Sequence, residues 1–84
     1  MKEKIIDALH IPKELFSNIP KITLIGENDL TCENCGGLLT CTESLIRFYT
    51  GIGFLTISGS MLYIRELTEE LAVIGGKISG IVFE

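Results

Sequence analysis

The chain has 84 residues, of which 46% are apolar and 21% are charged, and its formal net charge at pH 7 is −4. This composition excludes an intrinsically disordered chain. No apolar run reaches the ~18–20 residues that a membrane-spanning helix needs, and the N-terminus lacks a signal-peptide pattern. We expect one domain over residues 1–84, with more apolar side chain than so small an interior buries.

Residues 1–20 have the pattern of a short N-terminal helical segment. Ile5, Ile6 and Leu9 share one helical face through i, i+3 and i+4 spacing. Pro12 ends this first piece, because the residue before a proline avoids the helical region. We therefore expect one or two short amphipathic helices that pack on the rest of the chain.

Residues 21–84 have the pattern of a β body. Short runs rich in β-branched residues are separated by glycine and polar turn residues, and no helical periodicity interrupts them. The pattern predicts a mainly β fold: a small antiparallel β-roll, sandwich or barrel of about eight short strands, preceded by the N-terminal helix. The expected strands are residues 22–25, 30–34, 38–42, 45–50, 54–57, 61–67, 71–74 and 77–83.

The alternation of side chains along these strands assigns them to two faces. The inward face is expected to hold Leu24, Ile46, Phe48, Leu55, Ile57, Leu62, Ile64, Leu71, Val73, Ile78, Ile81 and Phe83. The outward face is also apolar and is expected to hold Ile25, Leu45, Tyr49, Phe54, Met61, Tyr63 and Ile74. Large exposed apolar patches usually mark contact sites. Either the N-terminal helix covers this outward face alone, or a partner or a second copy covers the rest.

The three cysteines, Cys32, Cys35 and Cys41, allow more than one interpretation. An odd number of cysteines does not make a closed disulfide framework and favours a reducing, intracellular setting. Residues three apart in a strand point to opposite faces, so Cys32 and Cys35 diverge unless a turn intervenes. We expect buried thiols; the alternative is a zinc site formed by these three cysteines, although a structural zinc ion usually has four protein ligands.

No residue pattern predicts catalysis. His10 has no nucleophile partner in an evident motif. Ser58 and Ser60 lie in a predicted turn rather than at the strand-to-helix elbow of a nucleophilic serine. Glu69 and Glu70 fall in another predicted turn, and Gly75-Gly76 is expected to be a hairpin turn because no helix follows it. We therefore expect no catalytic, cofactor-binding or metal residues.

The charge distribution argues against nucleic-acid binding, because that function needs a basic patch. Residues 22–84 carry three bases and eight acids, and the bases are Arg47, Arg65 and Lys77. The resulting net charge of −5 also argues against direct attraction to anionic lipid.

The order of the apolar and glycine positions resembles the YabP/YqfC family of sporulation proteins. The resemblance rests on residues 15–26, on residues 30–34 with the glycine turn that follows, and on residues 55–65, 71–75 and 77–83. Ile11-Pro12-Lys13 and Ile19-Pro20-Lys21 are closer to the YqfC branch. The family pattern is expected to place large apolar residues near Cys32 and Cys41 and a histidine-like residue at Cys35. This departure favours buried thiols over zinc ligands.

The resemblance implies a cytoplasmic protein of the mother cell during endospore formation, held at the forespore membrane through a partner and not inserted in it. It also implies that the partner is a YqfD-like membrane-bound sporulation protein, and it transfers no catalytic or cofactor residue. Together with the apolar outward face, it predicts a non-enzymatic assembly module that forms a homo-oligomer or docks on such a partner. The alternative is a small zinc-stabilised regulatory or binding module that uses Cys32, Cys35 and Cys41.

Overall fold

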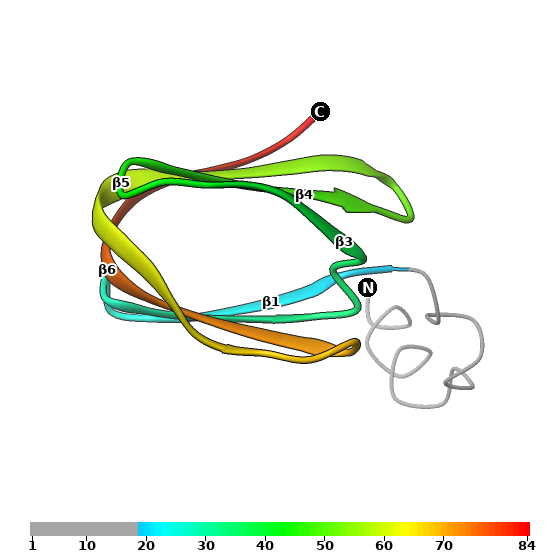
Figure 1. The fold of residues 1–84 in the computed structure, drawn as a ribbon, viewed down its shortest axis with the longest axis horizontal. Helices are drawn as coiled ribbons and strands as arrows, with labels where there is room; N and C mark the ends of the chain where they lie inside the picture. Colours follow the sequence, from blue (N-terminus) through cyan, green and yellow to red (C-terminus); the bar gives the residue numbers. More distant parts are fainter. Residues whose placement is uncertain (1–18) are drawn as a thin grey trace, which may run out of the picture.

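The computed structural model describes residues 19–84, which form one antiparallel β-sheet (Figure 1). Its strands are β1 (Lys21–Ile25), β2 (Asp29–Glu33), β3 (Gly37–Cys41), β4 (Leu45–Thr50), β5 (Gly53–Leu67) and β6 (Leu71–Phe83). Their order is β1-β2-β6-β5-β4-β3, so the sheet is open and does not close into a barrel. The predicted mainly β fold is confirmed, whereas the predicted N-terminal helix lies outside the described residues.

The prediction of about eight strands is wrong, because four of the predicted strands merge into β5 and β6. The expected turns at residues 58–60 and at Gly75-Gly76 are bends inside these two strands. Gly75 pairs with Tyr63, and Lys77, on the other side of the bend, pairs with Ser60 of the same neighbouring strand. Glycine and serine are compatible with a bend within a strand as well as with a turn between strands. Only the pairing with a neighbouring strand distinguishes a bend from a turn.

The bends in β5 and β6 fold the sheet over into two facing layers (Figure 1). Register shifts occur between Ser58 and Gly59 and between Ser60 and Tyr63, and such bulges bend a strand and increase its twist. The upper layer in Figure 1 contains β3, β4 and the first half of β5, together with the second half of β6. The lower layer contains β1, β2 and the remaining halves of β5 and β6.

The β1–β2 turn holds the bend of β6. The side-chain amide of Asn28 donates a hydrogen bond of 2.9 Å to the carbonyl of Gly76, and the backbone N–H of Ile78 donates to the carbonyl of Glu27 at 2.7 Å. Gly76 adopts a φ of 110°, a conformation that glycine reaches without a Cβ clash. The turn therefore satisfies backbone groups that the bend removes from the β ladder.

The β3–β4 turn holds the bend of β5 in the same way. The backbone N–H groups of Gly59 and Leu62 donate to the carbonyls of Ser44 and Glu43 at 3.1 and 2.8 Å. A Cβ at position 59 would collide with the backbone carbonyl of Lys77, so only glycine fits here. The β1–β2 and β3–β4 turns thus each hold the bend of one long strand.

Threonine forms two of the hairpin turns. The Thr42 hydroxyl accepts the backbone N–H groups of Ser44 and Leu45 at 3.3 and 2.9 Å. The turn after β5 repeats this arrangement, because the Thr68 hydroxyl accepts the N–H of Leu71 at 3.0 Å. A threonine hydroxyl that bonds the backbone two or three residues on favours a turn, which is why both hairpins reverse where the sequence predicts.

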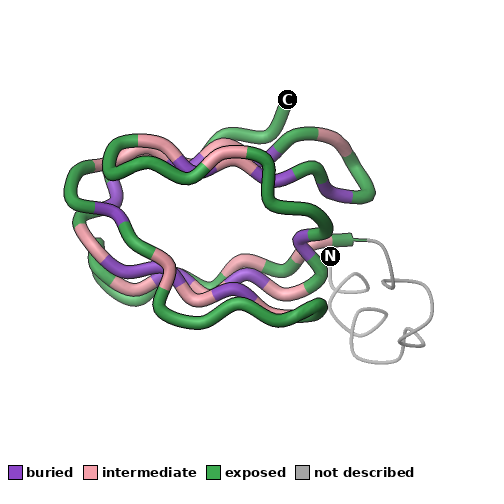
Figure 2. Tube along the Cα trace, viewed as in Figure 1, coloured by how far each residue is buried: buried purple, intermediate pink, exposed green. Residues whose placement is uncertain are grey.

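The core consists of residues from both layers, and buried positions occur along both layers of the trace (Figure 2). Its buried apolar members are Leu30, Cys32, Cys35, Ala72 and Ile74 from the lower layer and its connection, Ile46, Phe48, Leu55 and Ile57 from the upper layer, and Leu62 and Ile78 beside the bends. Ile22, Ile64 and Ile81 pack against them. This enclosure explains how a two-layer fold of this size buries a continuous core.

The predicted inward face is correct for six residues that are buried: Ile46, Phe48, Leu55, Ile57, Leu62 and Ile78. It is wrong at the start of β6, where Ala72 and Ile74 point inward in place of Leu71 and Val73. Ile74 pairs with the buried Leu30 of β2, and cross-strand partners share a face. Because both faces of this segment are apolar, the local alternation did not decide its phase.

Two other predicted core residues face inward but remain exposed. Leu24 pairs with Leu30, and Phe83 pairs with Leu55, so both lie on the inner face. Each is 45% exposed, because Leu24 is on the edge strand β1 and Phe83 is at the end of β6. On the outward face, Ile25, Tyr49, Phe54, Met61 and Tyr63 are exposed as predicted, while Leu45 is half-buried.

Candidate binding surface

The structure joins Cys32 and Cys35 in a disulfide, with their Cα atoms 5.9 Å apart. Asn34 and Gly36 have φ angles of 63° and 78°, and these left-handed residues turn the chain at the end of β2 so that both sulfurs point into the core. The expectation of burial is confirmed for both residues. The expectation that they are free thiols is wrong. The sequence allowed a turn between the two cysteines without requiring it, and this turn brings their sulfurs together.

Cys41 does not join this pair. It is an exposed free cysteine at the end of β3, so the prediction of a third buried thiol is wrong. Across residues 19–84, no three histidine, cysteine or acidic side chains are close enough to hold a metal ion. The alternative of a zinc site formed by all three cysteines is therefore not supported.

Ser58 and Glu70, two of the residues considered for catalysis, contribute backbone groups to a bend and a turn of the sheet. The Ser58 carbonyl accepts a hydrogen bond from the Ser79 hydroxyl, within the bend of the sheet. Glu70 lies in the Thr68 turn, where its N–H donates to the threonine hydroxyl. His10 lies outside the described residues. The positions of Ser58 and Glu70 are explained by the turns and bends that contain them.

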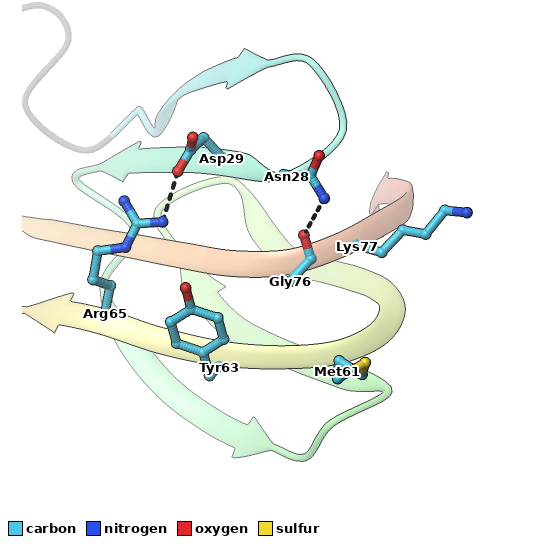
Figure 3. A pocket seen from close by; sticks show the side chains of 7 residues that line it. All are labelled: Asn28, Asp29, Met61, Tyr63, Arg65, Gly76 and Lys77. Atoms are coloured by element: carbon cyan, nitrogen blue, oxygen red, sulfur yellow. Dashed lines mark hydrogen bonds and ion pairs between the residues drawn. The ribbon is translucent and has the colours of Figure 1, made fainter.

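A shallow hollow of about 430 Å³ lies between the β1–β2 turn and the bends of β5 and β6 (Figure 3). It is lined by Asn28, Asp29, Met61, Tyr63, Arg65, Gly76 and Lys77. Arg65 donates to the Asp29 carboxylate at 2.8 Å. A hydrogen bond with the Tyr63 hydroxyl, followed by Asp29, raises the pKa of Arg65 above its ordinary value. Arg65 is thus already paired with an acidic side chain, and Lys77 is the second cation that lines the hollow.

The second surface feature is an aromatic cluster on the outer face of the upper layer. We define the Tyr49–Phe54 patch as Arg47, Tyr49, Phe54, Thr56, Val82 and Glu84. Tyr49 pairs with Phe54 across β4 and β5, and Thr56 pairs with both Arg47 and Val82. Because cross-strand partners share a face, the antiparallel register places these residues from three adjacent strands on one surface.

Contacts within the Tyr49–Phe54 patch fix its side chains. The rings of Tyr49 and Phe54 have centroids 5.2 Å apart and planes inclined at 51°. The guanidinium carbon of Arg47 lies 4.8 Å from the centroid of the Phe54 ring. Arg47 also donates to the Thr56 hydroxyl at 3.2 Å and lies 3.6 Å from the Glu84 carboxylate. The arginine is thus held flat against the sheet, with its charge matched by Glu84.

The patch combines exposed aromatic and apolar side chains with one arginine. Tyrosine and arginine are enriched among residues that dominate binding energy, and rigid aromatic side chains lose little entropy on binding. Tyr49 is 58% exposed and Val82 is 49% exposed. The sequence predicted that Tyr49 and Phe54 point outward but missed the contribution of Val82 and Glu84. Their place follows from the pairing of β6 with β5, for which the sequence offers no local signal.

Fold and surface together define a class: small antiparallel β proteins with an open sheet and an exposed aromatic surface. Within that class the chain belongs to the YabP family, whose sequence model matches residues 17–84. It is 32% identical over 78 residues to the uncharacterized protein YqfC of Bacillus subtilis (strain 168), which covers 93% of this chain and 84% of that protein. No solved structure matches the chain. Residues 19–84 contain no helix with the length and apolarity needed to cross a bilayer.

Proposed function

We propose that this protein is a non-enzymatic assembly module of endospore formation that binds a protein partner through the Tyr49–Phe54 patch. The observation that carries the proposal is the ordered stack of Arg47, Phe54 and Tyr49 on an exposed sheet face. Side chains that are already fixed by contacts lose less entropy on binding than free ones. A sheet face of this kind is prepared for contact before a partner arrives.

The charge of the patch indicates what kind of partner it suits. Arg47 and Glu84 are within 3.6 Å and balance each other, so the surface around the rings carries little net charge. Long-range attraction therefore contributes little, and burial of Tyr49, Phe54 and Val82 supplies the binding energy. This favours an apolar protein surface over nucleic acid, whose binding depends on many unbalanced cationic side chains.

Membership of the YabP family supports the setting of the proposal. The resemblance in the sequence points to a cytoplasmic role in the mother cell, and the partner that it favours is a YqfD-like membrane-bound sporulation protein. In this proposal the β module stays outside the bilayer. It is held at the forespore membrane only by the contact between the patch and that protein.

Co-purification tests the proposal. The full chain would be co-expressed with the YqfD-like protein of the same organism, and the complex would be isolated in detergent through a tag on the membrane protein. We expect the unaltered chain to be retained. The double variant Tyr49→Ser, Phe54→Ser should lower the retained amount roughly tenfold or more, since hot-spot aromatic residues each contribute more than about 1 kcal/mol.

A matched control separates the patch from general surface apolarity. Ile25 is 68% exposed on the outer face of β1, in the other layer. Ile25→Ser should leave retention unchanged. Equal retention of the double patch variant and the unaltered chain would contradict the proposal, and so would failure of the unaltered chain to co-purify at all.

A further inference from the structure

The folded sheet leaves four strand edges without a neighbour among residues 19–84. The lower layer ends at β1 and at the second half of β5, and the upper layer ends at β3 and at the second half of β6. An unpaired edge presents N–H and C=O groups to which another strand can add. The four edges differ in how well they are protected from such pairing.

The second half of β6 has backbone groups aimed away from the sheet. Glu84 and Phe54 exchange two hydrogen bonds, with N···O distances of 2.8 and 3.4 Å. Residues of an antiparallel strand bond alternately to the two sides, so Phe83 and Ile81 direct their N–H and C=O groups to the open side. No described strand lies there, because β2 pairs only with residues 71–75 of β6.

The equivalent edge of β5 is protected. β5 and β6 occupy equivalent positions in the two layers. The first half of β5 pairs with β4 and the first half of β6 pairs with β2, while the second half of each strand lies at an edge. The end of β5 carries Arg65 and Glu66 and a register shift at this point, and charges and bulges are the usual devices against strand addition. The end of β6, by contrast, is regular and uncharged from Gly80 to Phe83.

The two remaining edges carry partial protection. The β3 edge is interrupted by a register shift between Leu38 and Thr40. The β1 edge follows Pro20, which has no N–H, and opens with the charged Lys21. The rest of β1 is regular and uncharged, so it is the natural position for a control.

We propose that a second copy of this chain adds its β6 edge antiparallel to the β6 edge of the first, about a two-fold axis at Val82, to make one continuous sheet. The proposal rests on the assembly role proposed above and adds to it a second contact, between two copies of the chain, beside the contact of the Tyr49–Phe54 patch with the membrane-bound partner. In this register Ile81 of one copy lies opposite Phe83 of the other. Each of these two residues directs one N–H and one C=O outward, so all four outward groups of each copy form hydrogen bonds with the other copy. The edge is self-complementary, because residues 80–83 hold no charge that would face its like.

The pairing also explains why apolar side chains remain uncovered near this edge. Phe83 is on the inner face yet half-exposed, and a neighbouring strand would cover it with Ile81 of the second copy. On the outer face, the two Val82 residues would form a non-hydrogen-bonded pair, because their backbone groups bond to β5 of their own copy. Side chains in such a pair lie closer together than those in a hydrogen-bonded pair. The Tyr49–Phe54 patches of the two copies would then form one continuous surface.

Cysteine cross-linking of the full chain tests this geometry. Val82→Cys would be made in a Cys41→Ser background, which removes the exposed thiol. Mild oxidation should link two copies through position 82. The matched control is Thr23→Cys in the same background, since Thr23 is exposed in the middle of the β1 edge. We expect the Val82→Cys dimer to form roughly tenfold faster or more, because pairing raises the local thiol concentration.

A backbone variant tests whether the edge itself carries the dimer. Phe83→Pro removes an outward N–H without breaking the β5–β6 ladder, and Phe83→Ala removes the same side chain while keeping the N–H. By light scattering at tens of micromolar, Phe83→Ala should remain dimeric, whereas the dimer of Phe83→Pro should be about tenfold weaker or more.

Three results would overturn the inference: a monomeric unaltered chain at this concentration, faster cross-linking at Thr23, or equal dimer affinities for Phe83→Pro and Phe83→Ala. None of them affects the proposed partner contact. Co-purification with the YqfD-like protein, blocked by the patch variant, would then leave the proposed function in place without the dimer.

Discussion

The aromatic ring of Tyr63 lies over Gly75, its cross-strand partner at the bend of the sheet. A Cβ added at Gly75 would come within 2.5 Å of the ring and hydroxyl of Tyr63. The ring covers backbone that a glycine leaves bare, an arrangement that stabilises strands containing glycine. It also holds the tyrosine hydroxyl beside Arg65, so one pair of residues links the bend to the rim of the hollow.

Gly75→Ala is predicted to displace the Tyr63 ring with little loss of stability. The ring is half-exposed and free to rotate outward, and alanine suits a strand better than glycine does. We expect the free energy of unfolding to change by less than about 1 kcal/mol. Tyrosine fluorescence in a Tyr49→Phe background, where Tyr63 is the remaining tyrosine, would report the movement. Unchanged fluorescence would contradict the close contact.

Gly59→Ala is predicted to be far more damaging. Its Cβ would meet the backbone carbonyl of Lys77, which cannot move without opening the bend. We expect a loss of roughly 2–4 kcal/mol, the range of severe steric effects, measured by urea denaturation. Gly37→Ala is the control: its Cβ would meet nothing within 4 Å, so it should be neutral or slightly stabilising. Equal effects of the two substitutions would show that the bend is not constrained at Gly59.

Thr68→Val is predicted to destabilise the turn between β5 and β6. The Thr68 hydroxyl accepts N–H groups from Glu70 and Leu71, and valine keeps the shape while removing both bonds. The expected loss is about 1 kcal/mol, since the turn is exposed and water replaces part of the interaction. Thermal unfolding would measure it, with Thr23→Val, on the exposed β1 edge, as a control expected to show no loss. A stability unchanged by Thr68→Val would mean that the hydroxyl does not stabilise the turn.

Reduction of the Cys32–Cys35 disulfide is predicted to lower stability without unfolding the protein. The bond closes a loop of only a few residues, so the chain-entropy estimate of its contribution is about 2 kcal/mol. The freed thiols would remain packed in the core as small apolar groups. Urea denaturation with and without reductant measures the difference, and Cys41→Ser provides a control that should not change it. A midpoint insensitive to reductant would rule out a stabilising disulfide.

The local features of the fold were readable in the sequence. The first four strands begin and end within about two residues of their predicted bounds, in keeping with the usual precision of such boundaries. Each of these strands is short and is followed by residues with strong turn chemistry. The outward position of Tyr49 and Phe54 also followed from alternation alone, because Phe48 and Leu55 beside them are unambiguous core residues.

The incorrect predictions concern segments whose local sequence is compatible with two different structures. Gly75-Gly76 suits a hairpin turn or a bend, and the choice depends on whether β5 continues alongside. The phase of Leu71 to Ile74 depends on the partner strand β2, since every residue there is apolar. The bond between Cys32 and Cys35 depends on a left-handed conformation at Asn34, which a sequence permits without specifying.

The sequence by itself determined that this protein is mainly β, that two of its turns lie at residues 43–44 and 68–70, and that its outward face carries apolar side chains. Those properties depend on neighbours a few residues apart. Only the tertiary structure decided that β5 and β6 bend to form two layers and that Arg47, Phe54 and Val82 form one surface. It also decided that no strand within residues 19–84 pairs with the outer edge at Phe83. These properties depend on pairing between strands distant in the chain, where the register, and not the local pattern, selects which side chains meet.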